Sequence, residues 1–158
     1  MKVLLIVWHS QFGGTAQMAN AARAGATAIP DVEVVYRRAA EAGVDDMLGC
    51  SGLLVATSEN FGSLAGATKD FFERVYYPCE HRVEGLPYSV LVCAGTDGSQ
   101  AMLQTDRIAT GLRLRKVHPG VVYRSGLTAQ AQVVPQDALA QCEEIGGTLA
   151  AGIAAGIY

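Results

Sequence analysis

Short apolar runs alternate with amphipathic stretches along this chain. Residues 3–7 (VLLIV) are continuously apolar and rich in β-branched side chains, which is typical of a strand buried on both faces of a parallel sheet. From Gly14 onward apolar residues follow helical spacing until Pro30 ends the stretch. A buried strand followed by an amphipathic helix is the repeating unit of α/β proteins.

The same unit recurs to the end of the chain. Further strands are predicted at residues 32–35, 53–56, 89–94 and 120–123. Further helices are predicted at residues 64–76 and 101–114, with a short one at 44–48 and a last one that opens at Pro135 and carries Leu139, Cys142, Ile145 and Leu149. Five strands alternating with helices predict one doubly wound domain over residues 1–158. The last helix is rich in Gly and Ala, which predicts close backbone approach to the sheet or to another subunit, with packing within the chain favoured.

The composition indicates a folded protein and argues against nucleic acid as its partner. Apolar residues make up 50% of the 158 residues and charged residues 17%, unlike a disordered chain. Twelve Lys and Arg against fifteen Asp and Glu give a net charge of −3, and no basic stretch favours nucleic acid. The N-terminal apolar run lacks a signal-peptide cleavage site, and no apolar stretch reaches the ~20 residues that a membrane span needs.

Four cysteines lie at positions 50, 79, 93 and 142, without a CxxC pair or a histidine at metal-ligand spacing. A chain of this size folds without disulfides, so we interpret them as reduced thiols of a cytoplasmic protein that holds no metal. Cys93 and Cys142 fall at apolar positions and are expected in the core.

The loop of residues 10–15 (SQFGGT) carries the first chemical signal, because it leads from a buried strand into a helix. Ligands of open parallel sheets bind beyond the carboxyl ends of the strands. Glycines here present backbone N–H groups, hydroxyls stand at both ends, and the helix dipole adds positive potential. The loop has no Lys or Arg and no GxxxxGK[ST] pattern, which favours a phosphate monoester over a Mg-nucleotide. A simple helix cap is the alternative.

Two other α/β functions are excluded by the same loop. It lacks the nucleophilic Cys and the Arg of a low-molecular-weight phosphatase. The end of the first strand has His9 and Ser10 where a phospho-receiver domain needs an acidic pair.

Three loops together resemble the flavodoxin superfamily. Residues 10–15 look like its S/T-x-T-G-x-T phosphate loop, with Phe12 where Thr is usual. Residues 57–66, continuing into 69–74, are similar to the P-x-x-F-G-S-x-S-G-x-x-K-x-F-x-D-R run of flavodoxin-like NAD(P)H:quinone and FMN reductases. Residues 94–100 resemble the glycine-rich loop after the fourth strand in that group. The resemblance implies a flavodoxin-like three-layer fold with strand order 2-1-3-4-5.

The resemblance also implies a noncovalently bound FMN that carries the chemistry, with no catalytic side chain and no metal. The implied cofactor-binding residues are Ser10, Gln11, Phe12, Gly13, Gly14, Thr15, Ala16, Glu59, Asn60, Phe61, Gly62, Ser63, Ala94, Gly95, Thr96, Asp97 and Gly98. The flavin ring needs a flat neighbour, for which Phe61 and Trp8 are candidates, each with core packing as the alternative. The segment with Tyr76, Tyr77, Cys79 and His81 is expected either to wall the open face of the ring or to pack on the surface.

The function implied is an FMN-dependent NAD(P)H oxidoreductase that reduces a quinone or similar small acceptor. The alternatives are a flavodoxin-type electron carrier that docks to protein partners, and a flavin-free binding module. Carriers of this fold resemble one another in being strongly acidic, so a net charge of −3 favours the enzyme. No basic residue is assignable to a 2′-phosphate, which leaves NADH and NADPH both open. Quinone reductases of this kind often build the ring pocket between subunits, which implies a homo-oligomer.

Overall fold

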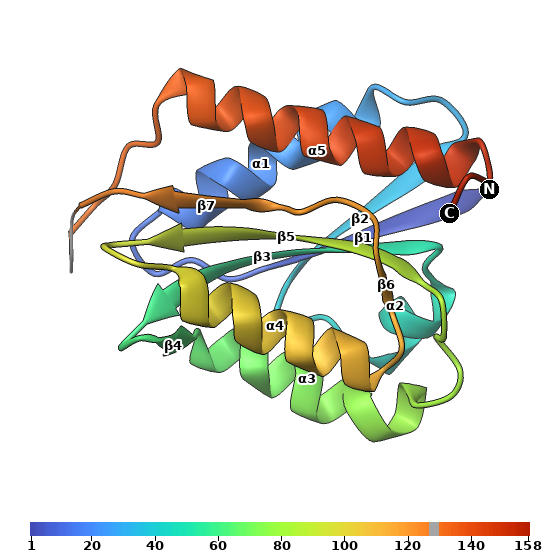
Figure 1. Ribbon diagram of the computed structural model, residues 1–158. Coiled ribbons are helices and arrows are strands. Elements are labelled where there is room, and N and C mark those ends of the chain that lie inside the picture. Colours follow the sequence, from blue (N-terminus) through green and yellow to red (C-terminus); the bar gives the residue numbers. More distant parts are fainter. Residues whose placement is uncertain (127–129) are drawn as a thin grey trace.

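A parallel sheet forms the middle layer of the computed structural model, which describes residues 1–126 and 130–158 (Figure 1). The strand order is β2-β1-β3-β5, with β6 and β7 both beside β5 at the far edge and β4 antiparallel to β3. Since β6 and β7 share the fifth position, the predicted order 2-1-3-4-5 is confirmed. The strands are β1 (Lys2–Trp8), β2 (Val32–Arg38), β3 (Gly52–Asn60), β4 (Ser63–Leu64), β5 (Pro87–Ala94), β6 (Arg115–Lys116) and β7 (Val121–Arg124).

Helices cover both faces of the sheet (Figure 1). Two helices lie on one face, α1 (Gly14–Thr27) and α5 (Gln136–Ala154), and three on the other, α2 (Val44–Gly49), α3 (Gly66–Cys79) and α4 (Ser99–Gly111). None of the helices in the described part of the chain has the length and apolar character that crossing a bilayer requires.

The alternation of side chains along the strands divides the core in two. On β1, Leu4 and Ile6 belong to the cluster shared with α1 and α5, whereas Leu5 and Val7 belong to the cluster shared with α2, α3 and α4. All four are fully buried. Neither face of this strand contacts solvent, which is why residues 3–7 are apolar without interruption.

Glycines let α1 and α5 approach backbone to backbone. A Cβ built on Gly25 of α1 would run into the carbonyl oxygen of Glu143, and one built on Gly146 of α5 would run into the carbonyl oxygen of Ala22. Contacts of this kind leave no room for a side chain between the helices. The close approach favoured for the Gly- and Ala-rich last helix within the chain is therefore observed, but its backbone contacts are with α1 and not with the sheet as predicted.

The predicted helices 64–76 and 101–114 differ from α3 and α4 by two or three residues at each end, and two of these differences have a local cause. The helix predicted from residue 64 begins at Gly66, because Ser63 and Leu64 form β4. The helix predicted over 101–114 ends at Gly111, because Arg113 adopts a left-handed φ of 58° and the N–H of Leu114 bonds back to Ala109 at 2.9 Å. This arrangement closes the last turn of α4 in the manner of a Schellman motif.

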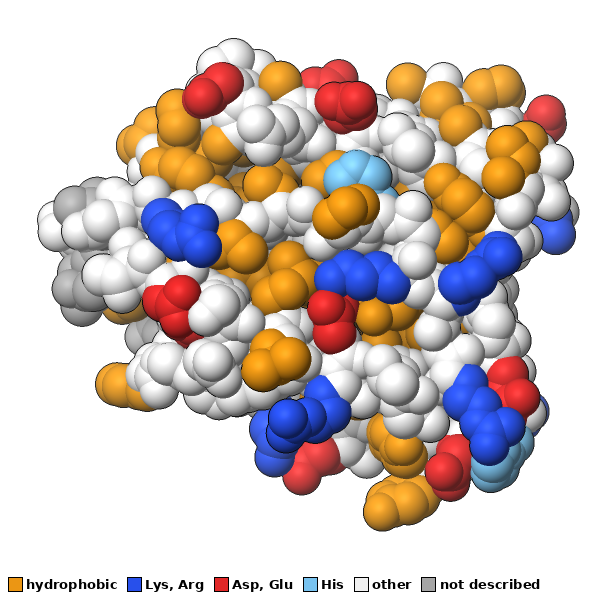
Figure 2. Space-filling view, viewed as in Figure 1, with side chains coloured by type: hydrophobic (Ala, Val, Ile, Leu, Met, Phe, Trp, Pro, Cys, Tyr) orange, Lys and Arg blue, Asp and Glu red, His pale blue; other side chains and the backbone are white. Residues whose placement is uncertain are grey.

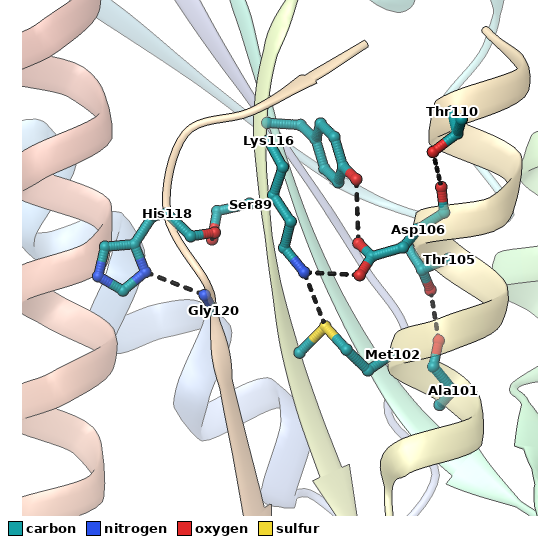
Figure 3. A network of polar contacts seen from close by, with 10 residues as sticks. Ser89, Ala101, Met102, Thr105, Asp106, Thr110, Lys116, His118 and Gly120 are labelled. Atoms are coloured by element: carbon teal, nitrogen blue, oxygen red, sulfur yellow. Dashed lines mark hydrogen bonds and ion pairs between the residues drawn. The ribbon is translucent and has the colours of Figure 1, made fainter. Parts of the chain in front are cut away.

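Two short strands, β6 and β7, occupy the fifth position of the sheet, because residues 117–120 interrupt the pairing with β5. Pro119 has no N–H for the ladder, and Gly120, at φ 81°, lies so close to the backbone of Val90 that a Cβ would strike its carbonyl oxygen. His118 stabilises the interruption (Figure 3): its carbonyl accepts the Ser89 hydroxyl at 3.3 Å, and its Nδ1 accepts the N–H of Gly120 at 3.0 Å.

At the same edge of the sheet, but on the face that α4 covers, a carboxylate joins α4 to β5 and β6 (Figure 3). Asp106 accepts hydrogen bonds from the Tyr88 hydroxyl at 3.0 Å and from Lys116 Nζ at 2.7 Å. Burial, and then the Asp106 carboxylate, raise the pKa of Tyr88 above its ordinary value, so the phenol remains a hydrogen-bond donor at neutral pH.

All four cysteines carry free thiols, and Cys79, Cys93 and Cys142 are buried. The core positions predicted for Cys93 and Cys142 are thus confirmed. Burial raises the pKa of Cys50 and of Cys142 to about 12 and that of Cys93 to about 11, and it also raises the pKa of Cys79.

These shifts predict that native thiols resist alkylation. The thiolate is the reactive form, and a thiol with a pKa near 11 is only about 0.1% ionised at pH 8. We expect iodoacetamide to label Cys50, Cys93 and Cys142 of the native protein at pH 8 at least ~100-fold more slowly than in the urea-unfolded chain, with the rate rising as pH approaches 11. Mass spectrometry after timed quenching measures the labelling of each cysteine, and rapid native labelling of any of these three contradicts the prediction.

Candidate functional site

A hollow of about 350 Å³ lies at the carboxyl ends of β1, β3 and β5, a size within the range of ligand sites. Its walls come from three strand ends, the start of α1 and the segment between β7 and α5. The lining residues are Ser10, Gln11, Phe12, Gly14, Thr15, Ser58, Glu59, Asn60, Phe61, Cys93, Gly95 and Gln132. Glu59 is the one charged side chain among these described residues.

The first loop folds into a tight turn that starts α1. The Ser10 hydroxyl accepts the backbone N–H of Gly13 at 3.0 Å, and Gly13, the N-cap, has a left-handed φ of 93° that favours glycine. No side chain caps α1, and its first turn, which includes Thr15 and Ala16, has no acidic residue. The positive end of this helix therefore faces the hollow without an anionic side chain of its own.

The second loop presents an aromatic side chain to solvent. Asn60 of β3 pairs with Ser63 of β4, and the two residues between them, Phe61 and Gly62, have φ values of 55° and 66°, as a type I′ turn requires. Such a φ is rare for an aromatic residue. Phe61 is fully exposed at the rim of the hollow, so the alternative that it packs into the core is wrong.

Glu59 joins the second loop to the third. Its two carboxylate oxygens accept the backbone N–H groups of Gly98 and Ala101, each at 2.9 Å, at the start of α4. The start of α4 is thus already neutralised by a carboxylate, in contrast to that of α1. Glu59, one of the predicted cofactor-binding residues, uses its carboxylate to hold the start of α4, and the residue also lines the hollow.

The structure brings together nine of the predicted site residues around the hollow, namely Ser10, Gln11, Phe12, Gly14, Thr15, Glu59, Asn60, Phe61 and Gly95. The other predicted residues are not part of its lining: Gly13, Ala16, Gly62, Ser63, Ala94, Thr96, Asp97 and Gly98. Gly98 packs against Val122 and Ala94, where a Cβ would not fit. Ser63 is held by Gln104 of α4, which accepts its hydroxyl at 3.0 Å.

Three lining residues were not among the predicted ones. Ser58 precedes Glu59, and its hydroxyl oxygen is buried without a hydrogen-bond partner among the residues that the structure describes. Cys93 was read as a core residue, and Gln132 follows the fifth strand in a segment without any motif. Of these three residues, only Ser58 could have been predicted from the sequence, because it is a hydroxyl residue next to the predicted ligand-binding residues 59–63.

The segment with Tyr76, Tyr77, Cys79 and His81 does not wall this hollow. The first three lie at the end of α3, which starts near β4 and runs toward the amino-terminal edge of the sheet (Figure 1). Trp8 is not a wall either, because it packs against the core and stacks on Tyr36 with ring centroids 5.3 Å apart. In the described part of the chain, no group of three His, Cys, Asp or Glu side chains is arranged to hold a metal ion.

No family model matches this sequence. The chain is 28% identical to an NAD(P)H dehydrogenase (quinone) of Acidithiobacillus ferrooxidans, in a match that takes in 47% of this chain and 47% of that protein. The matched region thus spans about half the length of this curated relative.

The fold resembles that of solved flavodoxins over nearly the whole chain. A flavodoxin from the domain Archaea superimposes with a TM-score of 0.78 at 15% identity, covering 96% of this chain and 98% of that chain. A WrbA-like flavodoxin from Agrobacterium tumefaciens superimposes with a TM-score of 0.75 at 14% identity, covering 97% and 98%. The chain therefore has a flavodoxin-like fold.

Proposed function

We propose that this protein binds FMN in the hollow and passes electrons from NAD(P)H through it to a quinone or similar small acceptor. The observation that carries the proposal is the buried Ser58 hydroxyl, which has no hydrogen-bond partner in the described part of the chain, in a hollow that the start of α1, not capped by any described side chain, also faces. A buried hydroxyl without a partner costs about 1–3 kcal/mol, which an acceptor such as a phosphate oxygen recovers. The name of the Acidithiobacillus relative supports the choice of NAD(P)H and a quinone.

The residues present fit the phosphate end of FMN. Neutral donors line the hollow: Gly14 and Thr15 offer backbone N–H groups from the first turn of α1, and Ser58 offers its hydroxyl. The helix dipole supplies positive potential without Lys or Arg. The Glu59 carboxylate is offset by the start of α4, which reduces its repulsion of an anion. We infer that these groups hold a phosphate monoester.

The opposite wall suits a flat ring. Phe61 offers an exposed aromatic face at the rim, and the turn of residues 60–63 offers backbone groups for hydrogen bonds to ring heteroatoms. FMN, when bound, supplies hydride acceptance and one- or two-electron transfer. The chain's residues bind and orient the ring, exclude water and leave one side open to the electron donor and acceptor.

Charge favours the enzyme over the electron carrier. A net charge of −3 over 158 residues gives little electrostatic steering toward a protein partner. On the face seen in Figure 2, Lys and Arg side chains lie interspersed with Asp and Glu, without a broad acidic field. The carrier remains the second candidate, because the solved flavodoxins resemble the chain over nearly its whole length. Four free thiols are consistent with the cytoplasm as its location.

Two measurements in sequence test the proposal. Apoprotein is first titrated with FMN and with riboflavin while flavin fluorescence is followed; we expect quenching by both and tighter binding of FMN. FMN-loaded protein is then mixed with NADH or NADPH and benzoquinone. Saturable turnover supports the enzyme, and flavin binding without turnover supports the carrier. If the apoprotein does not bind FMN, both the enzyme and the electron carrier are excluded.

A further inference from the structure

Gln132 lies against the loop that starts α1, although the two segments are far apart in the chain. Its backbone N–H donates to the carbonyl of Phe12 at 3.1 Å, and its own carbonyl accepts Gln17 Nε2 at 2.7 Å. Gln17 also donates to the carbonyl of Gly13 at 3.0 Å and accepts the N–H of Val134 at 3.0 Å. These bonds fix the Gln132 backbone on the loop that forms the anion-binding end of the hollow.

The side chain of Gln132 enters the hollow beside Gly14. Its Oε1 accepts the Cys93 thiol at 3.1 Å, and its Nε2 donates to the Ser125 hydroxyl at 3.2 Å. A Cβ built on Gly14 would run into Oε1 and into Cys93 Sγ, so the carboxamide fills the space that a side chain there would occupy. Burial keeps Cys93 as a neutral thiol with a pKa of about 11, and a neutral thiol donates to Oε1.

This placement coincides with the one departure of the loop from the phosphate-loop pattern. Phe12 stands where that pattern has a hydroxyl residue, and the backbone carbonyl of Phe12 is the group that the Gln132 N–H binds. A carboxamide NH₂ has two N–H donors and carries no charge. Oε1, which faces Gly14, is an acceptor and is occupied by the Cys93 thiol. The Ser125 hydroxyl accepts one N–H of Nε2, and among the described residues the other N–H has no acceptor, so this is the neutral donor that an anion in the hollow can use.

We propose that Gln132 is a phosphate-binding residue of this site, whose carboxamide replaces the donor absent at Phe12. This inference rests on the proposed binding of FMN and adds a residue to it from outside the three predicted loops. It makes Gln132 specific for the phosphate of the ligand rather than for the flavin ring.

Four variants compared with FMN and riboflavin test the inference by equilibrium fluorescence titration. Gln132→Glu places a carboxylate beside the phosphate, and we expect it to weaken FMN binding at least about tenfold while changing riboflavin binding less than about threefold. Gln132→Ala should weaken FMN binding by roughly three- to tenfold. Phe12→Thr in the Gln132→Ala background should restore most of that loss, since it returns a hydroxyl donor. Gln141→Glu, on the exposed side of α5, adds the same charge away from the hollow and should change neither affinity.

A second readout does not depend on the flavin. Inorganic phosphate should raise the thermal midpoint of wild-type apoprotein and of Gln141→Glu, and should raise that of Gln132→Glu much less. Circular dichroism confirms that each variant is folded before it is compared. Equal losses for FMN and riboflavin in Gln132→Glu, or unchanged FMN binding in both Gln132 variants, would overturn the inference and leave the proposed function standing. Absence of FMN binding by the wild type would overturn both.

Discussion

Replacing Gly146 by Val is expected to destabilise the protein by more than about 3 kcal/mol, a large share of the ~5–15 kcal/mol typical of a domain. The Cβ of any residue at this position would strike the backbone carbonyl of Ala22, and a backbone atom cannot rotate away as a side chain can. The two helices must separate, which opens the packing between Gly25 and Glu143 as well. Urea unfolding followed by circular dichroism measures the change.

The neighbouring Gly147 provides a matched control. The nearest atom to a Cβ there is the carbonyl oxygen of Gly25 at 3.4 Å, which is an ordinary contact. Gly147→Ala should therefore stabilise the protein by roughly 0.5–1 kcal/mol through helix propensity, whereas Gly146→Ala should destabilise it. If Gly146→Ala stabilises the protein as Gly147→Ala does, the backbone contact between α1 and α5 is not as close as the structure has it.

The layout of strands and helices was predictable because a parallel sheet buries both faces of its strands. Residues 3–7 are apolar at every position, and this pattern identifies a buried strand without knowledge of the strands that pair with it. The two-residue strands β4 and β6 have no periodicity to detect. Leu64 fits the apolar face of the following helix by spacing, but its N–H is taken by Gln104 Oε1 at 2.8 Å, a contact 40 residues away in the chain.

The part of the site that a single loop forms could be predicted from the sequence. The part formed by segments far apart in the chain could not. The turn of residues 10–15 contains its own glycines and hydroxyls, so its shape follows from local sequence. Gln132 meets Gln17 across 115 positions, and nothing near residue 132 indicates that contact. Composition also could not separate the roles of Ser58 and Glu59, since the direction of each side chain depends on where α4 begins.

We expect the Ser58 hydroxyl to contribute more to the free energy of FMN binding than to the stability of the apoprotein. This difference distinguishes a ligand-binding residue from a structural one. Ser58→Ala removes a buried hydroxyl that has no partner among the described residues, so the apoprotein should keep its stability or gain up to about 1 kcal/mol. FMN binding should weaken about tenfold, because one hydrogen bond to a charged phosphate is lost. Ser58→Asp should weaken it at least a further tenfold, since like charges about 5 Å apart repel by roughly 3 kcal/mol.

Ser89→Ala is the contrasting variant: the Ser89 side chain is buried, as the Ser58 hydroxyl oxygen is, but Ser89 donates its hydroxyl to the carbonyl of His118. It should lose about 1 kcal/mol of stability and leave FMN affinity unchanged, the reverse of Ser58→Ala. Thermal unfolding of the apoproteins and FMN titration of the same samples give both quantities for each variant. If Ser58→Ala destabilises the apoprotein and binds FMN as the wild type does, its hydroxyl serves the fold, and the phosphate-binding role assigned to it is wrong.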